Sequence, residues 1–140
     1  MTRQSDQVGA LCYRRTGNKS LRILLVTSRE TRRWVIPKGW HEKGAKGHQS
    51  AAQEALEEAG AIGRVSTRSI GLFHYLKQEE KGDLDLCVAV YLLQVKRLRS
   101  DWKERKERTR KWFSVTAAAK KVDEPELAAL VRNLADHLKD

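Results

Sequence analysis

One stretch, from Pro37 to Gly60, constrains this chain more than any other. It begins as a glycine-punctuated loop and continues as a segment with helical periodicity. Its apolar positions recur on one face and are Ala51, Ala52, Ala55, Leu56 and Ala59. We therefore expect a helix from about Gly47 or His48 to Ala59, ended by Gly60, a residue type favoured just past helix C-termini. No Ser, Thr, Asp or Asn stands near Lys46, so the N-terminal boundary is less well marked.

The same helix carries three acids, Glu54, Glu57 and Glu58. At about 100° per residue, positions 57 and 58 lie roughly 60° and 40° either side of position 54, so one face carries all three carboxylates. These charges repel each other unless a cation joins them. Taken alone, a Glu-x-x-Glu-Glu pattern is usually a solvated helix face. Carboxylate oxygens also suit Mg²⁺ or Mn²⁺, and such a metal can polarise a phosphoryl oxygen.

The remaining chain reads as a sheet with helices packed on it. Apolar and alternating runs predict six strands: Gln7 to Arg14, Leu21 to Thr27, Trp34 to Ile36, Arg64 to Leu76, Leu84 to Val95, and Trp112-Phe113. A loop is expected over 38–47, a hairpin turn over 77–83 and a charge-rich connection over 101–111. A closing amphipathic helix is marked by Leu127, Leu130, Val131, Leu134 and Leu138. This order predicts an α/β fold, a mixed β-sheet sandwiched between helices, in a single domain over 1–140.

Composition limits the setting of the protein. No run approaches the roughly 20 apolar residues of a membrane span, and no basic start precedes an apolar stretch. Cys12 and Cys87 lie in apolar runs without zinc-type spacing, which predicts buried thiols and a reducing cytoplasm. The net charge of +10 implies attraction to polyanions such as nucleotides, inositol phosphates or RNA, or else a solubilising basic surface.

The stretch from Pro37 to Gly60 resembles the Nudix box. That pattern starts with Gly, five residues, Glu and seven residues. It continues with Arg-Glu, a hydrophobic residue, any residue, Glu-Glu, any residue, Gly and a hydrophobic residue. The positions that match are Gly39, Glu54, Ala55, Glu57, Glu58, Gly60 and Ala61. Two positions depart from the pattern, because Ala45 stands where the first Glu belongs and Gln53 where the Arg belongs. The flanking strands and the terminal helix also fall where the Nudix fold places them, so the resemblance covers almost the whole chain.

The resemblance implies a hydrolase that cleaves phosphoanhydride bonds by water attack at phosphorus with bound Mg²⁺ or Mn²⁺. Carried over by position, Glu54, Glu57 and Glu58 are the expected metal ligands and catalytic acids, with the Lys38 carbonyl as a further ligand. The Glu missing at Ala45 is one that some relatives use as base, so that role stays unassigned. Glu79 or Glu80 is our favoured candidate base, and the other candidates are Glu42, Asp83 and Asp85.

Gln53 replaces an arginine that resembles an electrostatic anchor for the box glutamates in the family. An amide can hydrogen-bond a carboxylate but cannot neutralise it. The acids should therefore depend more on bound metal or on nearby lysines, which predicts stability linked to Mg²⁺ or Mn²⁺.

Substrate choice is indicated by Pro37-Lys38-Gly39-Trp40, which resembles the diphosphoinositol polyphosphate and diadenosine polyphosphate hydrolase branch. Trp40 is a candidate for stacking on a base or for closing the loop. Positive charge around the acids favours a highly phosphorylated substrate, and the residues expected to supply it are Arg32, Arg33, Lys38, Lys43 and Lys46.

Two alternatives stay open beside this small-molecule pyrophosphohydrolase. One is an RNA 5′-end pyrophosphohydrolase, for which the basic run from Lys103 to Lys111 would hold the phosphate backbone. The other is a binding module that kept the fold and lost catalysis, which Ala45 and Gln53 favour. A monomer or a homodimer is expected in either case.

Overall fold

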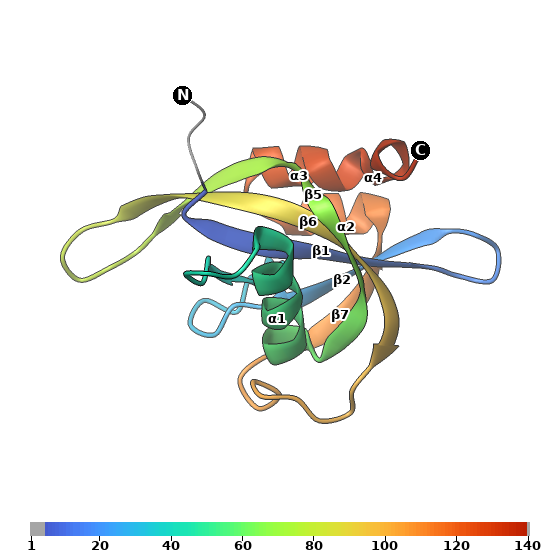
Figure 1. Ribbon diagram of the computed structural model, residues 1–140, viewed down its shortest axis with the longest axis horizontal. Coiled ribbons are helices and arrows are strands. Elements are labelled where there is room, and N and C mark those ends of the chain that lie inside the picture. The colour runs from blue at the N-terminus through green and yellow to red at the C-terminus, as the bar shows by residue number, and fades with distance from the viewer. Residues whose placement is uncertain (1–4, 140) are drawn as a thin grey trace.

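The computed structural model describes residues 5–139 as one mixed sheet flanked by helices (Figure 1). The strands are β1 (Gln7–Arg15), β2 (Leu21–Thr27), β3 (Trp34–Val35), β4 (Lys38–Trp40), β5 (Ala61–Lys77), β6 (Leu84–Leu98) and β7 (Arg110–Ser114). The helices are α1 (Gly47–Ala59), α2 (Val115–Lys121), α3 (Pro125–Arg132) and α4 (Leu134–His137).

The sheet is organised around β1 and β6, which pair in parallel from Gln7 opposite Val88 to Tyr13 opposite Gln94. The main path runs β3-β2-β1-β6-β5, with β4 also pairing with β1 and β7 with β2. All pairings other than β1 with β6 are antiparallel. The long strands β5 and β6 form the projecting hairpin seen in Figure 1.

Two hydrophobic clusters cover opposite faces of this sheet, so the α/β sandwich expected from the sequence is confirmed. One face packs against α1 through a cluster that includes Val8, Ala51, Ala55, Ala59 and Leu93. The other packs against the C-terminal helices through Phe73, Phe113, Leu127, Val131 and Leu134. Both cysteines are buried within or beside these strands. None of the helices within residues 5–139 is long and apolar enough to cross a membrane.

Helix α1 spans the range expected from its periodicity. Gly60 ends it with a φ of 64°, in the left-handed region, and its N–H donates to the carbonyl of Leu56 at 3.0 Å. At the other end the N-cap position is Lys46, and the Gln49 side chain accepts from its backbone N–H at 3.1 Å. A glutamine three residues into the helix therefore supports a start that lacks the usual cap.

The expected loop over 38–47 is wrong at its beginning, where the structure has strand β4. Lys38, Gly39 and Trp40 pair with the first residues of β1, with Trp40 opposite Gln7. Three residues that follow a proline show no period of two, so only this long-range pairing identifies the strand. The β5–β6 pair is also longer than expected, because Gly60 turns the chain directly from α1 into β5 at Ala61, opposite Leu98.

The C-terminal region contains three helices instead of one closing helix. Helix α2 follows β7 directly, and the Ser114 hydroxyl caps it by accepting from the Ala117 N–H at 3.1 Å. Pro125 begins α3, where its missing N–H costs no helical hydrogen bond. Asn133 separates α3 from α4, yet Leu127, Val131 and Leu134 still share one buried face.

Candidate functional site

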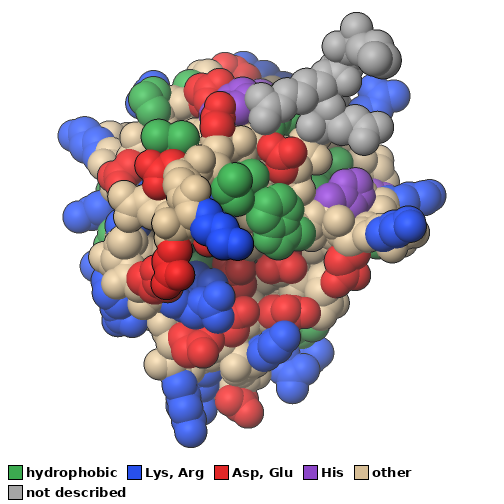
Figure 2. Space-filling model, turned by 90° about the vertical axis from the view of Figure 1, so that its left-hand side faces the viewer, with side chains coloured by type: hydrophobic (Ala, Val, Ile, Leu, Met, Phe, Trp, Pro, Cys, Tyr) green, Lys and Arg blue, Asp and Glu red, His purple; other side chains and the backbone are tan. Residues whose placement is uncertain are grey.

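A cleft of about 450 Å³ lies between α1, β4, the end of β5 and the loop before β7. Acidic side chains gather on the same side of the molecule in Figure 2, below hydrophobic and basic side chains. The acids that line the cleft are Glu42, Glu54, Glu58 and Glu104. The basic residues that line it are Arg29, Lys38, Lys77 and Arg108, and its two aromatic walls are Trp40 and Tyr75.

Glu54 and Glu58 form the floor of this cleft because they stand one helical turn apart on α1. Glu58 is 6% exposed, and its Oε1 accepts a hydrogen bond from the Lys38 backbone N–H at 3.3 Å. The Glu54 carboxylate packs against Gly39, where an added Cβ would lie 2.4 Å from the carboxylate carbon. The box glycine is therefore explained by the close approach of β4 to Glu54.

Burial and mutual repulsion make these two carboxyls hard to ionise together. Desolvation is the main cause that raises the pKa of Glu58 to about 8, where Arg108 lowers it and Glu54 raises it. Desolvation also raises the pKa of Glu54, against a hydrogen bond with Glu58 that lowers it. With its pKa at about 8, Glu58 retains a proton at neutral pH even though Arg108 lowers that pKa.

Glu57 does not join this pair. Its Oε2 accepts from the Gln53 amide at 2.7 Å, and its Oε1 lies 3.4 Å from the Lys103 ammonium. The reason is helical geometry, because Gln53 with Glu57 and Glu54 with Glu58 are two separate i, i+4 pairs on adjacent stripes. Within residues 5–139, no three His, Cys, Asp or Glu side chains converge as a ready metal site. The predicted three-glutamate cradle is therefore not preassembled.

The connection between β6 and β7 closes the C-terminal end of α1. The Glu104 N–H donates to the carbonyl of Glu57 at 3.1 Å, and the Trp102 indole N–H donates to that of Glu58 at 3.0 Å. The Arg110 guanidinium donates to the carbonyl of Ala59 at 2.8 Å, and the Arg99 N–H donates to that of Gly60 at 2.8 Å. Carbonyls at a helix end have no partner within the helix, so this loop satisfies them.

That docking brings Glu104 and Arg108 into the cleft. The Arg108 Nε donates to Glu104 Oε1 at 2.8 Å, its Nη2 lies 3.5 Å from Glu58 Oε2, and its Nη1 donates to the Thr27 carbonyl at 3.1 Å. The side chains of Arg108 and Glu104 are only 9% and 14% exposed. Neither residue was singled out for the site from the sequence, where both lay within a run of mixed charge that gave no sign of folding back onto α1.

The expected basic residues are distributed differently from the sequence prediction. Lys38 lines the cleft, with its ammonium 4.8 Å from the centre of the Tyr75 ring, and burial lowers its pKa. Arg32 instead donates to the Glu107 carbonyl at 3.3 Å, and Arg33 pairs with Glu124 at 2.9 Å. Lys43 lies exposed on the loop before α1. Arg29 and Lys77 are the lining cations that sequence reasoning missed.

The remaining predicted residues are Trp40, Glu79 and Glu80. Trp40 is 50% exposed at the mouth of the cleft, with the Lys77 ammonium 5.7 Å from its ring centre. Glu79 and Glu80 lie in the turn between β5 and β6 outside the cleft lining, and Glu79 is 3.7 Å from Lys77. These two acids therefore stand apart from the cleft, whereas Glu104 and Glu42 are acids outside α1 that line it.

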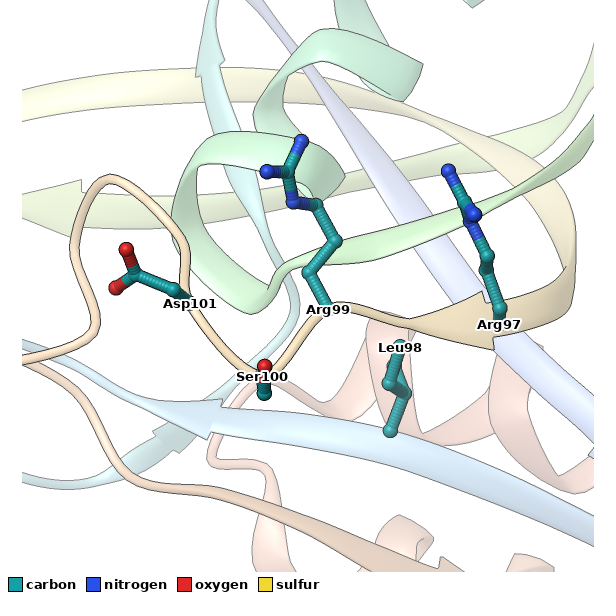
Figure 3. Close-up of a pocket in the computed structure, with 5 residues that line it drawn as sticks. All are labelled: Arg97, Leu98, Arg99, Ser100 and Asp101. Carbon is teal, nitrogen blue, oxygen red and sulfur yellow. The ribbon is translucent and has the colours of Figure 1, made fainter.

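A second hollow lies at the opposite end of β6 and is lined by residues 97–101 (Figure 3). Arg97 and Arg99 extend from the end of β6 toward the same side of the sheet, and Asp101 follows in the loop. None of the acids in the α1 pair borders this hollow, so it lacks the chemistry of the cleft.

A mixed sheet between helices, with a Gly39-to-Gly60 loop and helix placing acids in a cleft, defines a Nudix fold. A family model described as the NUDIX domain matches residues 4–134. The chain belongs to this family.

Similar proteins agree with this assignment. Over 116 residues the chain is 32% identical to human diphosphoinositol polyphosphate phosphohydrolase 3-beta, covering 81% of this chain and 66% of that protein. It is 32% identical over 111 residues to Nudix hydrolase 16, mitochondrial, of Arabidopsis thaliana, covering 76% and 61%. The chain thus spans roughly half to two thirds of the curated relatives it matches. The crystal structure of a C. elegans Ap4A hydrolase superposes with a TM-score of 0.68 at 19% identity, covering 96% of this chain and 98% of that one.

The donor chemistry of the cleft fits a divalent ion. Glu54, Glu58 and Glu104 offer hard carboxylate oxygens, and the first two are held close enough to disfavour double ionisation. Mg²⁺ commonly uses one or two carboxylates and takes its other ligands from water and substrate phosphate. A complete protein cage is therefore unnecessary, and the α1 pair is the natural place for such an ion.

Proposed function

We propose that the protein is a metal-dependent pyrophosphohydrolase that cleaves a phosphoanhydride bond in a polyphosphorylated small molecule, either a dinucleoside polyphosphate or a diphosphoinositol polyphosphate. The observation that carries this proposal is a single cleft whose lining includes the acids Glu54, Glu58 and Glu104 together with cations such as Lys38 and Lys77. The acids suit Mg²⁺ or Mn²⁺, and the cations suit a phosphate chain. The names of the human relative and of the C. elegans structure support the same two substrate classes.

Each part of the cleft has a separate task in this proposal. Glu54 and Glu58 would hold the ion, with Glu57 joining them after it leaves Gln53 and Lys103, and the Lys38 carbonyl is a further candidate ligand beside Glu58. The bound ion would polarise a phosphoryl oxygen and lower the pKa of its water. Lys38, Lys77 and Arg29 would bind the phosphates. Trp40 offers an exposed ring at the mouth for the rest of the substrate.

Glu104 is the acid we assign to water activation. It lines the cleft with one carboxylate oxygen held by Arg108 Nε, which leaves the other oxygen available to accept a proton. Glu79 and Glu80 remain candidates from the sequence, and Glu42 also lines the cleft beside Ala45. Conversion of each acid to its amide separates these assignments, because the amide keeps the shape and removes the basic oxygen.

The test is a panel of diadenosine polyphosphates, inositol pyrophosphates and triphosphorylated RNA, assayed with Mg²⁺ and with Mn²⁺ for phosphate or mononucleotide release. We expect turnover of a small-molecule polyphosphate. Glu58→Gln and Glu104→Gln should each lose at least about a hundredfold in kcat, whereas Glu79→Gln and Glu80→Gln should stay near wild type. Turnover of none of the panel with ligand binding intact would favour the binding module instead.

The RNA alternative rested on the basic run from Lys103 to Lys111, in which the structure largely buries the Arg108 side chain while those of Lys103 and Arg105 stay 69% and 59% exposed. Lys103 pairs with Glu57, Arg105 with Asp101, and Arg108 with Glu104. The Arg110 guanidinium lies 3.9 Å above the Trp102 ring. Burial of the Arg108 side chain removes one cation of this run from a possible backbone site, and preferential turnover of triphosphorylated RNA in the panel would favour the RNA alternative.

A further inference from the structure

Gln53 stands where the Nudix pattern has an arginine, so the acids of the cleft lack a cation at that position. Gln53 is neutral, and its amide donates to Glu57, which lies on the stripe outside the cleft. Lys103 also faces Glu57. These two contacts reach Glu57 and not Glu58 or Glu104, so a cation that holds the latter two acids comes from a different residue.

Arg108 is a largely buried guanidinium that contacts both of these acids. It reaches Glu104 at 2.8 Å through Nε and Glu58 at 3.5 Å through Nη2. Its third nitrogen is held by the Thr27 carbonyl at 3.1 Å, which belongs to β2 and not to the acid cluster. The sheet therefore fixes the guanidinium through Nη1, and Nη2 and Nε face the two carboxylates. A rigid planar guanidinium suits such an arrangement, because its donors point in fixed directions.

We propose that Arg108 is a positioning residue that holds Glu58 of α1 and Glu104 of the β6–β7 loop in one arrangement, which Gln53 cannot do from the outer stripe of α1. The inference rests on the proposed function, because it assigns the orientation of two acids to which that function gives roles. With Oε1 of Glu58 held by the Lys38 N–H and Oε2 facing Arg108, the plane of the carboxylate is set by two different strands and a loop.

The position of the cation gives two separable effects. As a positive charge beside Glu58, Arg108 opposes the binding of a divalent ion at the same carboxylate. As a planar fork, it orients Glu58 and Glu104 for catalysis. A lysine would keep the charge and lose the fork, whereas a methionine would lose both.

The experiment compares Arg108→Met and Arg108→Lys with a matched control from the same loop. Arg105 forms the equivalent i, i+4 pair with Asp101 at 3.7 Å, but it is 59% exposed and outside the cleft. Mn²⁺ binding is measured on substrate-free protein by the electron paramagnetic resonance signal of free Mn²⁺. We expect about tenfold tighter binding for Arg108→Met and wild-type binding for Arg108→Lys and Arg105→Met.

Turnover at saturating Mn²⁺ gives the second readout. Both Arg108 variants should lose about tenfold or more in kcat with little change in KM, while Arg105→Met keeps wild-type rates. Wild-type kcat in Arg108→Lys would overturn the positioning role. Unchanged or weaker Mn²⁺ binding in folded Arg108→Met would overturn the placement of its charge at the ion site.

A thermal double-variant cycle tests the contact without substrate or metal. If Arg108 holds Glu104, then Arg108→Lys combined with Glu104→Gln should melt no lower than the more damaging single variant. Fully additive losses would contradict the contact. Absence of turnover by the wild-type protein would refute the proposed function, while Mn²⁺ binding and this cycle would still decide the role of Arg108.

Discussion

Glu58 is the residue at which the contacts of the cleft meet. Its two carboxylate oxygens face the Lys38 N–H and Arg108, and its backbone carbonyl accepts from Trp102. Burial outweighs these favourable contacts and raises the pKa of its carboxyl to about 8. In the metal-free protein the acid at the centre of the site therefore holds a proton at neutral pH, and a bound cation would have to replace it.

This raised pKa predicts how stability changes with pH and metal. Between the ordinary pKa of 4.5 and about 8, the folded protein holds a proton that the unfolded chain releases. The contribution of Glu58 to stability is thus fully present below the lower value and is lost as pH rises toward the upper one. We expect the metal-free melting temperature to fall from pH 6 to pH 8, and the increase produced by Mg²⁺ or Mn²⁺ to grow over the same range.

The control is Glu58→Gln, which cannot ionise. This variant should show a flatter pH dependence and a smaller metal effect, both measured by thermal melting in buffers of equal ionic strength. A metal-induced shift of equal size at pH 6 and pH 8 in the wild-type protein would contradict the prediction.

At the scale of elements, α1 and the β6–β7 loop depend on each other. Four donors of the segment from Arg99 to Arg110 bind the carbonyls of residues 57–60, so the C-terminal end of α1 is closed by the loop that carries Glu104. Gly60 turns the chain at the same point, and its Cα is packed close to Trp102 and Arg110. Docking of this loop is therefore part of building the acid site.

Trp102→Phe tests this dependence. The substitution keeps an aromatic ring beneath Arg110 and removes the indole N–H that serves the Glu58 carbonyl. A buried carbonyl left without its donor costs about 1–3 kcal/mol, so we expect a loss of that order in urea unfolding. Hydrogen exchange should also show weaker protection of the Glu104 amide, which donates to the preceding carbonyl, that of Glu57.

Trp112→Phe is the matched control for this substitution. Trp112 lies on β7 with Arg14 4.1 Å above its ring, and phenylalanine preserves a ring at that position. The control should leave protection at Glu104 unchanged. Equal loss of protection in the two variants would show that the effect is general to aromatic truncation and would contradict a specific role for the indole N–H.

The sequence predicted those elements whose signals are local. The apolar face of α1 located its helix, and alternating runs located β1, β2 and most of β5 and β6. Strand β4 was missed because its existence depends on pairing with β1. In the candidate site, Glu54 and Glu58 follow from helical spacing, but Arg108 and Glu104 depend on how the long β6–β7 loop docks, and the local run of charges does not encode that geometry.

At the scale of the whole molecule, charge is distributed unevenly. The chain carries a net charge of +10, whereas the cleft lining has four acids and four cations. The positive exterior attracts a polyanion over distances of about one Debye length, roughly 10 Å at 0.1 M salt. The acids of the cleft repel the polyanion unless a bound ion neutralises them. Attraction by the positive exterior and an ion at the acids would therefore both favour binding of the substrate.

This arrangement predicts that kcat/KM for a polyphosphate falls as KCl is raised, and that the fall steepens with the number of phosphates in the substrate. The value of kcat at saturating substrate should change little, because screening acts mainly on association. Lys77→Gln, which removes a lining cation, should weaken the salt dependence, whereas Lys121→Gln at the end of α2 should leave it unchanged. Steady-state rates over a KCl series with fixed Mg²⁺ measure all three effects. Equal salt slopes for substrates of different charge, or for wild type and Lys77→Gln, would contradict electrostatic attraction of the substrate by the cations of this cleft.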